Sequence, residues 1–277
     1  MSLKIAIQGV KGSNHHQVAT DYFGHDIELV ECMSFDNLVD QLVNERADKA
    51  VMAIENSIAG SIIPNYALVN SKNLHIIGEY YLSIQHNLMV CKGQSLDDIE
   101  EVHSHPMALL QCKEFLRSYP KIKLVEAVDT AETAEQIQRH QLKTIAAIAP
   151  KAAAELYDLD IIASEIQTIS NNSTRFIIVS TTETNKELPS EEVNKASLRF
   201  MADHKRGSLA AILNVMSDCN LSLTKIQSLP VIEKPWKYSF FVDVTFDAYK
   251  NYLKAKSLLE IMAEDFKVLG EYKNGRV

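Results

Sequence analysis

The feature that most constrains the fold is a repeated order along the chain: a short apolar segment, a few small polar residues, then a stretch with helical spacing. It begins at residues 4–8, 48–54 and 125–128, among others. Apolar runs bounded by turn residues predict strands, and apolar residues at helical spacing predict the helices between them. The sequence therefore predicts an α/β fold whose polar clusters follow strands, where such domains bind ligands.

The polar cluster at residues 171–175 stands directly before the apolar strand expected at 176–179. Its small polar residues are ordinary turn chemistry, so a turn is one interpretation. The other is a rim of hydroxyl and amide groups that face a ligand. Similar clusters at residues 55–62 and 129–131 also follow strands, which favours a shared ligand site.

Composition limits the class of protein. The 277 residues include 46% hydrophobic and 23% charged residues and carry a net charge of −8, which predicts a soluble globular protein. An acidic chain without a Lys/Arg run is a poor match for nucleic acid, and no stretch approaches the length of a membrane span. Any anionic ligand must be held by local dipoles and a few cations.

Candidate metal and redox features are few. The four cysteines stand far apart without a CxxC spacing, so zinc is not expected. A cytoplasmic protein with reduced thiols is the default. His103 and His105 suggest a metal ion, but no third ligand recurs nearby, which favours structural histidines.

Three local patterns bear on the predicted site. Gly9 and Gly12 permit close backbone approach, and the helix after them favours an anion, although the Rossmann and P-loop patterns do not fit. Glu55 is either a cap for the next helix or a site residue. Ser104 has the position of an N-cap before a helix expected to reach about Tyr119.

The last third of the chain has a separate plan. A polar, charged stretch from Glu183 to Lys195, with Pro189, predicts a linker. After it we expect a strand at 196–201, a helix at 207–219, strands at 221–230 and 236–245, a helix at 248–262 and a strand at 266–269. This βαββαβ order predicts a small ferredoxin-like regulatory module.

Taken together, these segments resemble the prephenate dehydratase family with a C-terminal ACT domain, over nearly the whole chain. Four motifs carry the resemblance in the family's order. They are Glu55-Asn56-Ser57 with Gly60, Ser104-His105-Pro106 with Gln111-Cys112, Asp129-Thr130-Ala131, and Thr174-Arg175-Phe176. In the last third, the helix start Gly207-Ser208-Leu209 is similar to that of ACT domains.

The resemblance implies an α/β catalytic domain at residues 1–183 with two lobes, the second at roughly 82–165, like type II periplasmic binding proteins. It implies a linker at 184–195 and an ACT domain at 196–277. The implied reaction removes carbon dioxide and the ring hydroxyl from prephenate to give phenylpyruvate, in phenylalanine biosynthesis. No metal and no cofactor are implied.

The family's motifs also imply roles for single residues. Thr174 is expected to be catalytic, as a hydrogen-bond donor to the departing hydroxyl, because hydroxide is a poor leaving group. Arg175 is either a cation for the substrate or part of a surface or inter-lobe ion pair. The substrate-binding residues implied by the motifs are Glu55, Asn56, Ser57, Ser104, Gln111, Thr130, Arg175 and Phe176.

The ACT resemblance implies L-phenylalanine as effector and a homodimer or homotetramer joined through ACT domains. The implied allosteric residues are Gly207, Ser208, Leu209, Ser222, Leu223, Thr224, Gln227 and Ser228. The chain departs from the family at Gln227 and Leu229, where Glu and Arg are usual, and at Met107, where Gln is usual. Phenylalanine feedback through the ACT domain is implied, and the sequence does not set its strength.

Two other functions fit the same sequence. Arogenate dehydratase would use the amino-acid analogue of prephenate, and the motifs do not separate the two substrates. A metabolite-binding protein without catalysis would use the same two-lobed cleft. The presence of Thr174 with Asn56, Ser104 and Gln111 favours an enzyme, because a binder does not need that set of donors.

Overall fold

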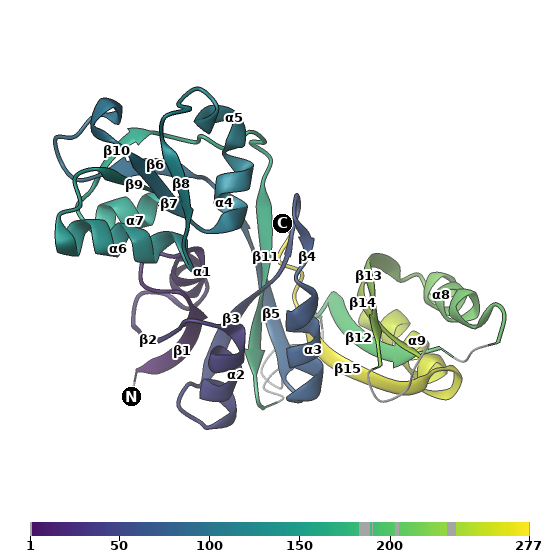
Figure 1. The fold of residues 1–277 in the computed structure, drawn as a ribbon. Helices are drawn as coiled ribbons and strands as arrows, with labels where there is room; N and C mark the ends of the chain where they lie inside the picture. Colours follow the sequence, from purple (N-terminus) through teal and green to yellow (C-terminus); the bar gives the residue numbers. More distant parts are fainter. Residues whose placement is uncertain (1, 183–188, 190, 203–204, 232–236, 277) are drawn as a thin grey trace. The chain divides into compact units, whose positions relative to one another are not determined.

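The computed structural model describes residues 2–182, 189, 191–202, 205–231 and 237–276. The chain forms two compact units, one of Met1–Gly60 with Tyr81–Phe176 and the other of Ser61–Tyr80 with Ile177–Val277. Each unit is described by itself. The predicted α/β class is confirmed, because parallel strands alternate with helices through most of the first unit (Figure 1).

The first sheet has the strand order β2-β1-β3-β11-β5, with the short β4 beside β3. β1 is parallel to both of its neighbours, and its residues Ile5, Ala6 and Ile7 are fully buried. The boundary between the units falls within β11 and β5. The elements are β1 (Leu3–Gln8), α1 (Asn14–Phe23), β2 (Ile27–Cys32), α2 (Phe35–Val43), β3 (Lys49–Asn56), β4 (Gly60–Ser61), β5 (His75–Ser83) and β11 (Ser173–Ser180).

The second sheet of the first unit has the order β10-β6-β9-β7-β8. Alternate residues of β6 pack on opposite faces: Met89 lies against helices α6 and α7, while Leu88 and Val90 lie against α4 and α5. Both faces are therefore covered (Figure 1). The elements are β6 (Asn87–Val90), η1 (Leu96–Asp98), β7 (Glu101–Ser104), α4 (Pro106–Gln111), α5 (Lys113–Leu116), β8 (Lys123–Glu126), α6 (Thr130–His140), β9 (Ile145–Ala149), α7 (Lys151–Leu156) and β10 (Asp160–Ala163).

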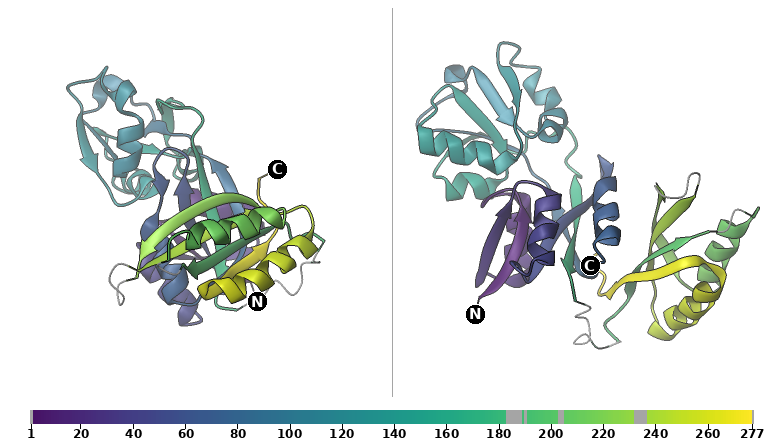
Figure 2. Two further views of the ribbon diagram at one scale, coloured as in Figure 1. Left: turned by 90° about the vertical axis from the view of Figure 1, so that its right-hand side faces the viewer. Right: turned by 60° about the horizontal axis from the view of Figure 1, so that its bottom comes forward.

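The second unit contains the predicted βαββαβ order. Its antiparallel sheet, β13-β14-β12-β15, fits an ACT-like module, and α8 and α9 cover one face of it (Figure 2). Tyr66 of α3 contacts Phe241 from the other face. The elements are α3 (Ile63–Ser71), β12 (Lys195–Met201), α8 (Ser208–Asp218), β13 (Ser222–Pro230), β14 (Tyr238–Thr245), α9 (Tyr249–Met262) and β15 (Glu264–Tyr272).

Several predicted boundaries were wrong. β11 begins at Ser173 rather than at 176, so Thr174 belongs to a strand and not to a turn. The helix expected to reach Tyr119 is divided at Cys112 into α4 and α5. Of the predicted linker, residues 183–188 and 190 lie outside the described residues, as does Trp236. No helix among the described residues is long and apolar enough to cross a membrane.

Candidate functional site

Asn56, at the carboxyl end of β3, is the centre of a hydrogen-bond cluster in the first unit. Its Oδ1 accepts the backbone N–H groups of Ile58 and Ala59, at 3.0 and 2.8 Å. Its Nδ2 donates to Asn172 Oδ1 at 2.7 Å and to Thr174 Oγ1 at 2.9 Å. The Asn56 side chain is therefore committed to contacts within the protein, and it orients its neighbours.

Asn172 and Gln111 extend this cluster to His86. Asn172 is 1% exposed and donates from Nδ2 to Gln111 Oε1 at 2.9 Å. The same Gln111 oxygen lies 2.8 Å from Nε2 of His86. Burial lowers the pKa of His86, so its imidazole is neutral at neutral pH. We name Asn56, Gln111, Asn172, Thr174 and His86 the amide cluster.

Thr174 is the hydroxyl of this cluster. It lies in β11 with 9% of its surface exposed, and its Oγ1 accepts the hydrogen bond from Asn56. Within the described residues no acceptor is in hydrogen-bond range of its hydroxyl proton. A hydroxyl whose oxygen accepts a hydrogen bond becomes a stronger donor. Thr174 can therefore donate to a bound molecule.

Two predicted substrate ligands make hydrogen bonds within the protein. Ser57 pairs with Ser173 of β11: its Oγ accepts the Ser173 N–H at 2.9 Å. Ser104 is fully buried in β7 and donates to the Ile148 carbonyl at 2.6 Å. The expected N-cap role of Ser104 was wrong, because His105 is the N-cap of α4.

The charged and aromatic motif residues lie close to the cluster in sequence. Arg175 is only 4% exposed, so the alternative of a surface ion pair was wrong. Phe176 is buried, with its ring edge-to-face with that of His15, 5.0 Å between centroids. Glu55 is half-buried at the end of β3, and Thr130 is buried at the start of α6.

The first polar loop approaches the second sheet's helices closely. A Cβ at Gly9, where φ is +90°, would lie 2.9 Å from the Asp129 carboxylate, and one at Gly12 would lie 3.1 Å from Ala153 Cα. Asp129 accepts the N–H groups of Ala131 and Glu132 at the start of α6, while burial raises its pKa. The predicted close approach is therefore between parts of the protein itself.

A cavity of about 330 Å³ lies beside Gln111. Exposed apolar side chains, including Met107 and Leu110, form much of its wall. Lys113 and Glu114 also line it, and Glu114 is paired with Arg117 at 2.5 Å. Met107, a predicted departure from the family pattern, is therefore part of the wall of this cavity.

The described residues contain no group of three His, Cys, Asp or Glu side chains placed to hold a metal ion. His103 instead contacts Glu101, with Nε2 2.7 Å from Oε2. All four cysteines are free and buried. Burial raises the pKa of Cys112 to about 12, so this thiol stays protonated.

In the second unit, Gly207, Ser208 and Leu209 line a cavity of about 540 Å³ with Tyr238 and Phe240. The other predicted allosteric residues lie on β13, which is an edge strand of its sheet. The structure therefore separates the predicted allosteric residues into a cavity group and an edge-strand group, the latter consisting of Ser222, Leu223, Thr224, Gln227 and Ser228.

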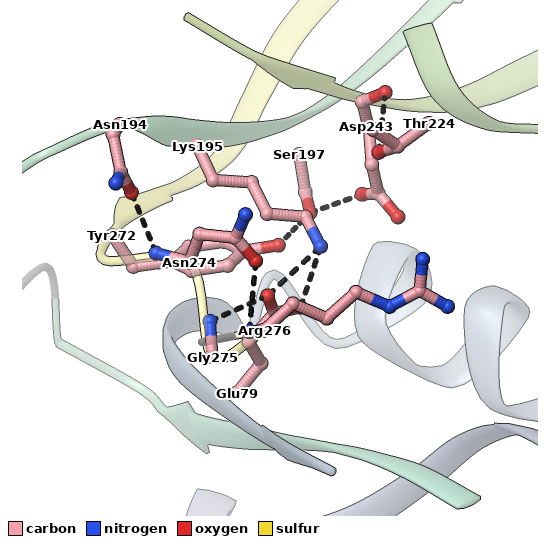
Figure 3. Close-up of polar contacts among 10 residues, drawn as sticks. All are labelled: Glu79, Asn194, Lys195, Ser197, Thr224, Asp243, Tyr272, Asn274, Gly275 and Arg276. Carbon is pink, nitrogen blue, oxygen red and sulfur yellow. Dashed lines mark hydrogen bonds and ion pairs between the residues drawn. The ribbon is translucent and has the colours of Figure 1, made fainter. Parts of the chain in front are cut away.

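A second polar cluster, which we name the ionic cluster, lies in the second unit (Figure 3). Lys195 Nζ is 2.8 Å from both carboxylate oxygens of Glu79, and the two side chains are 3% and 0% exposed. Gly275 donates its N–H to the same carboxylate at 2.9 Å. The cluster also includes Ser197 and Tyr272, whose hydroxyl oxygens are 2.6 Å apart.

Asn172 and His86 are the two members of the amide cluster that sequence reasoning missed as site residues. Asn172 was in the polar run before β11, where its amide was not distinguished from turn residues. His86 follows β5 in an extended stretch without a motif. Their partners are 61 and 25 residues away along the chain, so no local pattern indicates them.

Two comparisons with known proteins, with a family model and with a named relative, indicate the same family. Residues 5–184 match the family model for prephenate dehydratase. Arogenate dehydratase/prephenate dehydratase 2, chloroplastic, from Arabidopsis thaliana is 34% identical over 98% of this chain and 72% of that protein.

Two solved structures share the fold over 99% of this chain. One, described as GqqA, a novel type of quorum quenching acylases, is 26% identical with a TM-score of 0.86 and is covered to 98%. The other, prephenate dehydratase from Arthrobacter aurescens in complex with L-Phe, is 22% identical with a TM-score of 0.87 and is covered to 90%.

Proposed function

The chain belongs to the prephenate dehydratase family, and from that premise we propose that the amide cluster converts prephenate to phenylpyruvate. In this reaction the bond between the ring and its carboxylate breaks and carbon dioxide leaves. The electron pair of that bond enters the ring, which becomes aromatic and expels the hydroxyl from the opposite carbon. The departing hydroxyl needs a proton or a strong hydrogen bond.

The observation that carries this proposal is the hydrogen bond of Thr174. Its oxygen accepts from Asn56 at 2.9 Å, so its own proton can be given to the leaving hydroxyl. The bond from Asn56 draws electron density from the Thr174 oxygen and strengthens that donation. Assistance of this kind contributes about 10²- to 10⁴-fold to a rate.

The remaining predicted ligands then divide into two groups. The Gln111 oxygen accepts hydrogen bonds from Asn172 and His86, and the Gln111 amide N–H groups are proposed to donate to a carboxylate of the substrate. Asn56, Ser57 and Ser104 instead hold the protein in place through their own hydrogen bonds. Glu55, Thr130, Arg175 and Phe176 are proposed to shape the site around Thr174.

Arogenate is the second candidate substrate, because the Arabidopsis relative is named for both dehydratase activities. The ring chemistry is the same, so Thr174 has the same role. The two substrates differ only in the side chain, where arogenate carries an ammonium group in place of a keto oxygen. Since one fold can host several chemistries, the family match, more than the likeness to an acylase, supports a dehydratase.

Regulation and assembly are part of the same proposal. L-phenylalanine is proposed to bind at the cavity formed by Gly207, Ser208 and Leu209, supported by the family resemblance and by the L-Phe in the Arthrobacter aurescens structure. The edge strand β13 is proposed to meet a second copy in a homodimer or homotetramer. We propose residues 1–183 as the catalytic domain, 184–194 as linker, and an ACT domain that begins with β12 at Lys195 and extends to residue 277, in a cytoplasmic protein.

The test is to supply the purified chain with prephenate or with arogenate, with and without L-phenylalanine. Phenylpyruvate from prephenate, formed faster than phenylalanine from arogenate, is the expected result, with suppression by L-phenylalanine. A preference for arogenate would make arogenate, rather than prephenate, the first candidate substrate. Turnover of neither would contradict a dehydratase and favour a metabolite-binding protein.

A further inference from the structure

The direction of the hydrogen bonds in the amide cluster is fixed at one end by the backbone. Ile58 and Ala59 donate N–H groups, which can only be donors, to one side-chain atom of Asn56, so that atom is the oxygen. The other atom, Nδ2, also lies 3.4 Å from the Ser173 carbonyl, which can only accept. The orientation of the Asn56 amide is therefore determined.

The orientation of the Asn56 amide determines the orientation of the other amides in the cluster. Because Asn56 donates to Asn172, the receiving atom of Asn172 is its oxygen, and its nitrogen faces Gln111. The atom of Gln111 that receives this bond is then Oε1. Each amide can have only one orientation that gives every bond a donor and an acceptor.

His86 is the other contact of that Gln111 oxygen. Since Oε1 can only accept, Nε2 of His86 must carry a proton, and the neutral ring has a bare Nδ1. The histidine is itself held on both sides. The backbone N–H of His86 donates to Gln167 Oε1 at 2.9 Å, and the backbone carbonyl of His86 accepts the Ile166 N–H at 2.9 Å.

We propose that His86 is a positioning residue, which fixes the Gln111 amide so that its N–H groups face the 330 Å³ cavity and bind a carboxylate of the substrate. The inference rests on the proposed function and deepens it. Without the donor on His86, Gln111 would keep a single bond to Asn172 and its amide could turn away from the cavity.

The geometry also explains why a histidine suits this position. The donor must reach Gln111 Oε1 across 2.8 Å from a buried site that is 4% exposed. A charged donor there would need a counter-ion, whereas burial keeps this imidazole neutral. The ring therefore supplies one N–H bond without a net charge next to the ligand.

The test is a double-mutant cycle on kcat and KM for prephenate, using His86→Leu, Gln111→Ala and both together. His86→Leu is expected to raise KM about 10-fold, the value of one hydrogen bond, with a smaller change in kcat. His86→Gln keeps an N–H donor and is expected to stay within about 3-fold of the wild type. In the Gln111→Ala background, His86→Leu should add less than about 2-fold.

A role in structure alone gives a different result. His86→Leu would then reduce activity equally in both backgrounds, and His86→Gln would not restore KM, which overturns the inference. Long-range ¹H–¹⁵N spectra of histidine-labelled protein, assigned with His86→Gln, provide a readout without substrate. A proton on Nε2 is expected, and a proton on Nδ1 overturns the inference. Wild-type protein without prephenate turnover instead overturns the proposed function.

Discussion

The amide cluster of the first unit is partly buried and the ion pair of the second unit is fully buried, and the two clusters also differ in charge and in the hydrogen-bonding groups that they leave open. The amide cluster contains no charged group, and its Thr174 proton has no acceptor among the described residues. In the ionic cluster Lys195 and Glu79 neutralise each other, and a backbone N–H adds to the carboxylate (Figure 3). The amide cluster therefore has a donor for a ligand, whereas the ion pair of the ionic cluster makes its hydrogen bonds within the protein.

This difference in charge predicts that the amide cluster serves substrate binding and the ionic cluster serves stability. Buried neutral donors suit an anionic substrate, because each can add a hydrogen bond without a competing counter-ion. A buried ion pair is instead sensitive to the loss of either partner, since the remaining charge has no water around it. We therefore expect changes in the ionic cluster to alter stability and changes in the amide cluster to alter kcat or KM.

The largest expected effect on stability is at Lys195. Lys195→Met leaves the Glu79 carboxylate buried without its cation, and we expect a loss of about 3–5 kcal/mol in the free energy of unfolding. Urea unfolding followed by circular dichroism measures it.

The matched control replaces both partners. Glu79→Leu with Lys195→Met removes both charges, so most of the lost stability should return. If the single variant is as stable as the double variant, the ion pair does not hold the second unit in the way described.

A second prediction concerns the loss of stability at acidic pH that is caused by a buried histidine in the first unit. His15 Nε2 is buried and has no hydrogen-bond partner among the described residues, and burial lowers the pKa of His15 from 6.5 to about 3. The unfolded chain therefore binds a proton that the folded chain does not, between these two pKa values. This residue should cost about 2 kcal/mol of stability as pH falls from about 7 to about 5.

His15→Phe removes that titrating group while keeping a ring against Phe35 and Phe176. Urea unfolding at both pH values should show a smaller acid loss for the variant than for the wild type. Parallel pH dependences for the two proteins would show that folding does not lower the pKa of His15.

The smallest expected effect is on regulation. Gln227→Glu on the edge strand β13 restores the residue usual in the family, and should strengthen inhibition by L-phenylalanine about 3-fold without a change in kcat. Leu229 is less suitable, because it is buried and an Arg there would bring in a charge. Inhibition curves that coincide for variant and wild type would place the sensitivity elsewhere.

Periodicity predicted most of the fold because local spacing decides whether a segment becomes helix or strand. It also placed Asn56 and Thr174 next to strands that share one sheet. It did not predict the start of β11 at Ser173, where polar residues in a strand have the composition of a turn. Local composition was also misleading at Lys195, which was assigned to the polar linker but begins β12 and is buried.

Side-chain partners were less predictable than elements, because their contacts join distant parts of the chain. Asn56 and Thr174 are 118 residues apart, and Lys195 and Glu79 are 116 apart. The family motifs brought Asn56, Thr174 and Gln111 together as site residues. They did not indicate that Asn56 contacts Thr174 directly, nor that His86 completes the cluster.

The central claim is that the Thr174 proton assists the loss of the hydroxyl, and the most direct measurement is kcat for prephenate in Thr174→Ala beside Thr174→Ser. We predict a loss of about 10²-fold or more for Thr174→Ala, with unchanged unfolding by urea, and a much smaller loss for Thr174→Ser, which keeps the hydroxyl. A Thr174→Ala protein that is folded and has near-normal kcat would contradict the account.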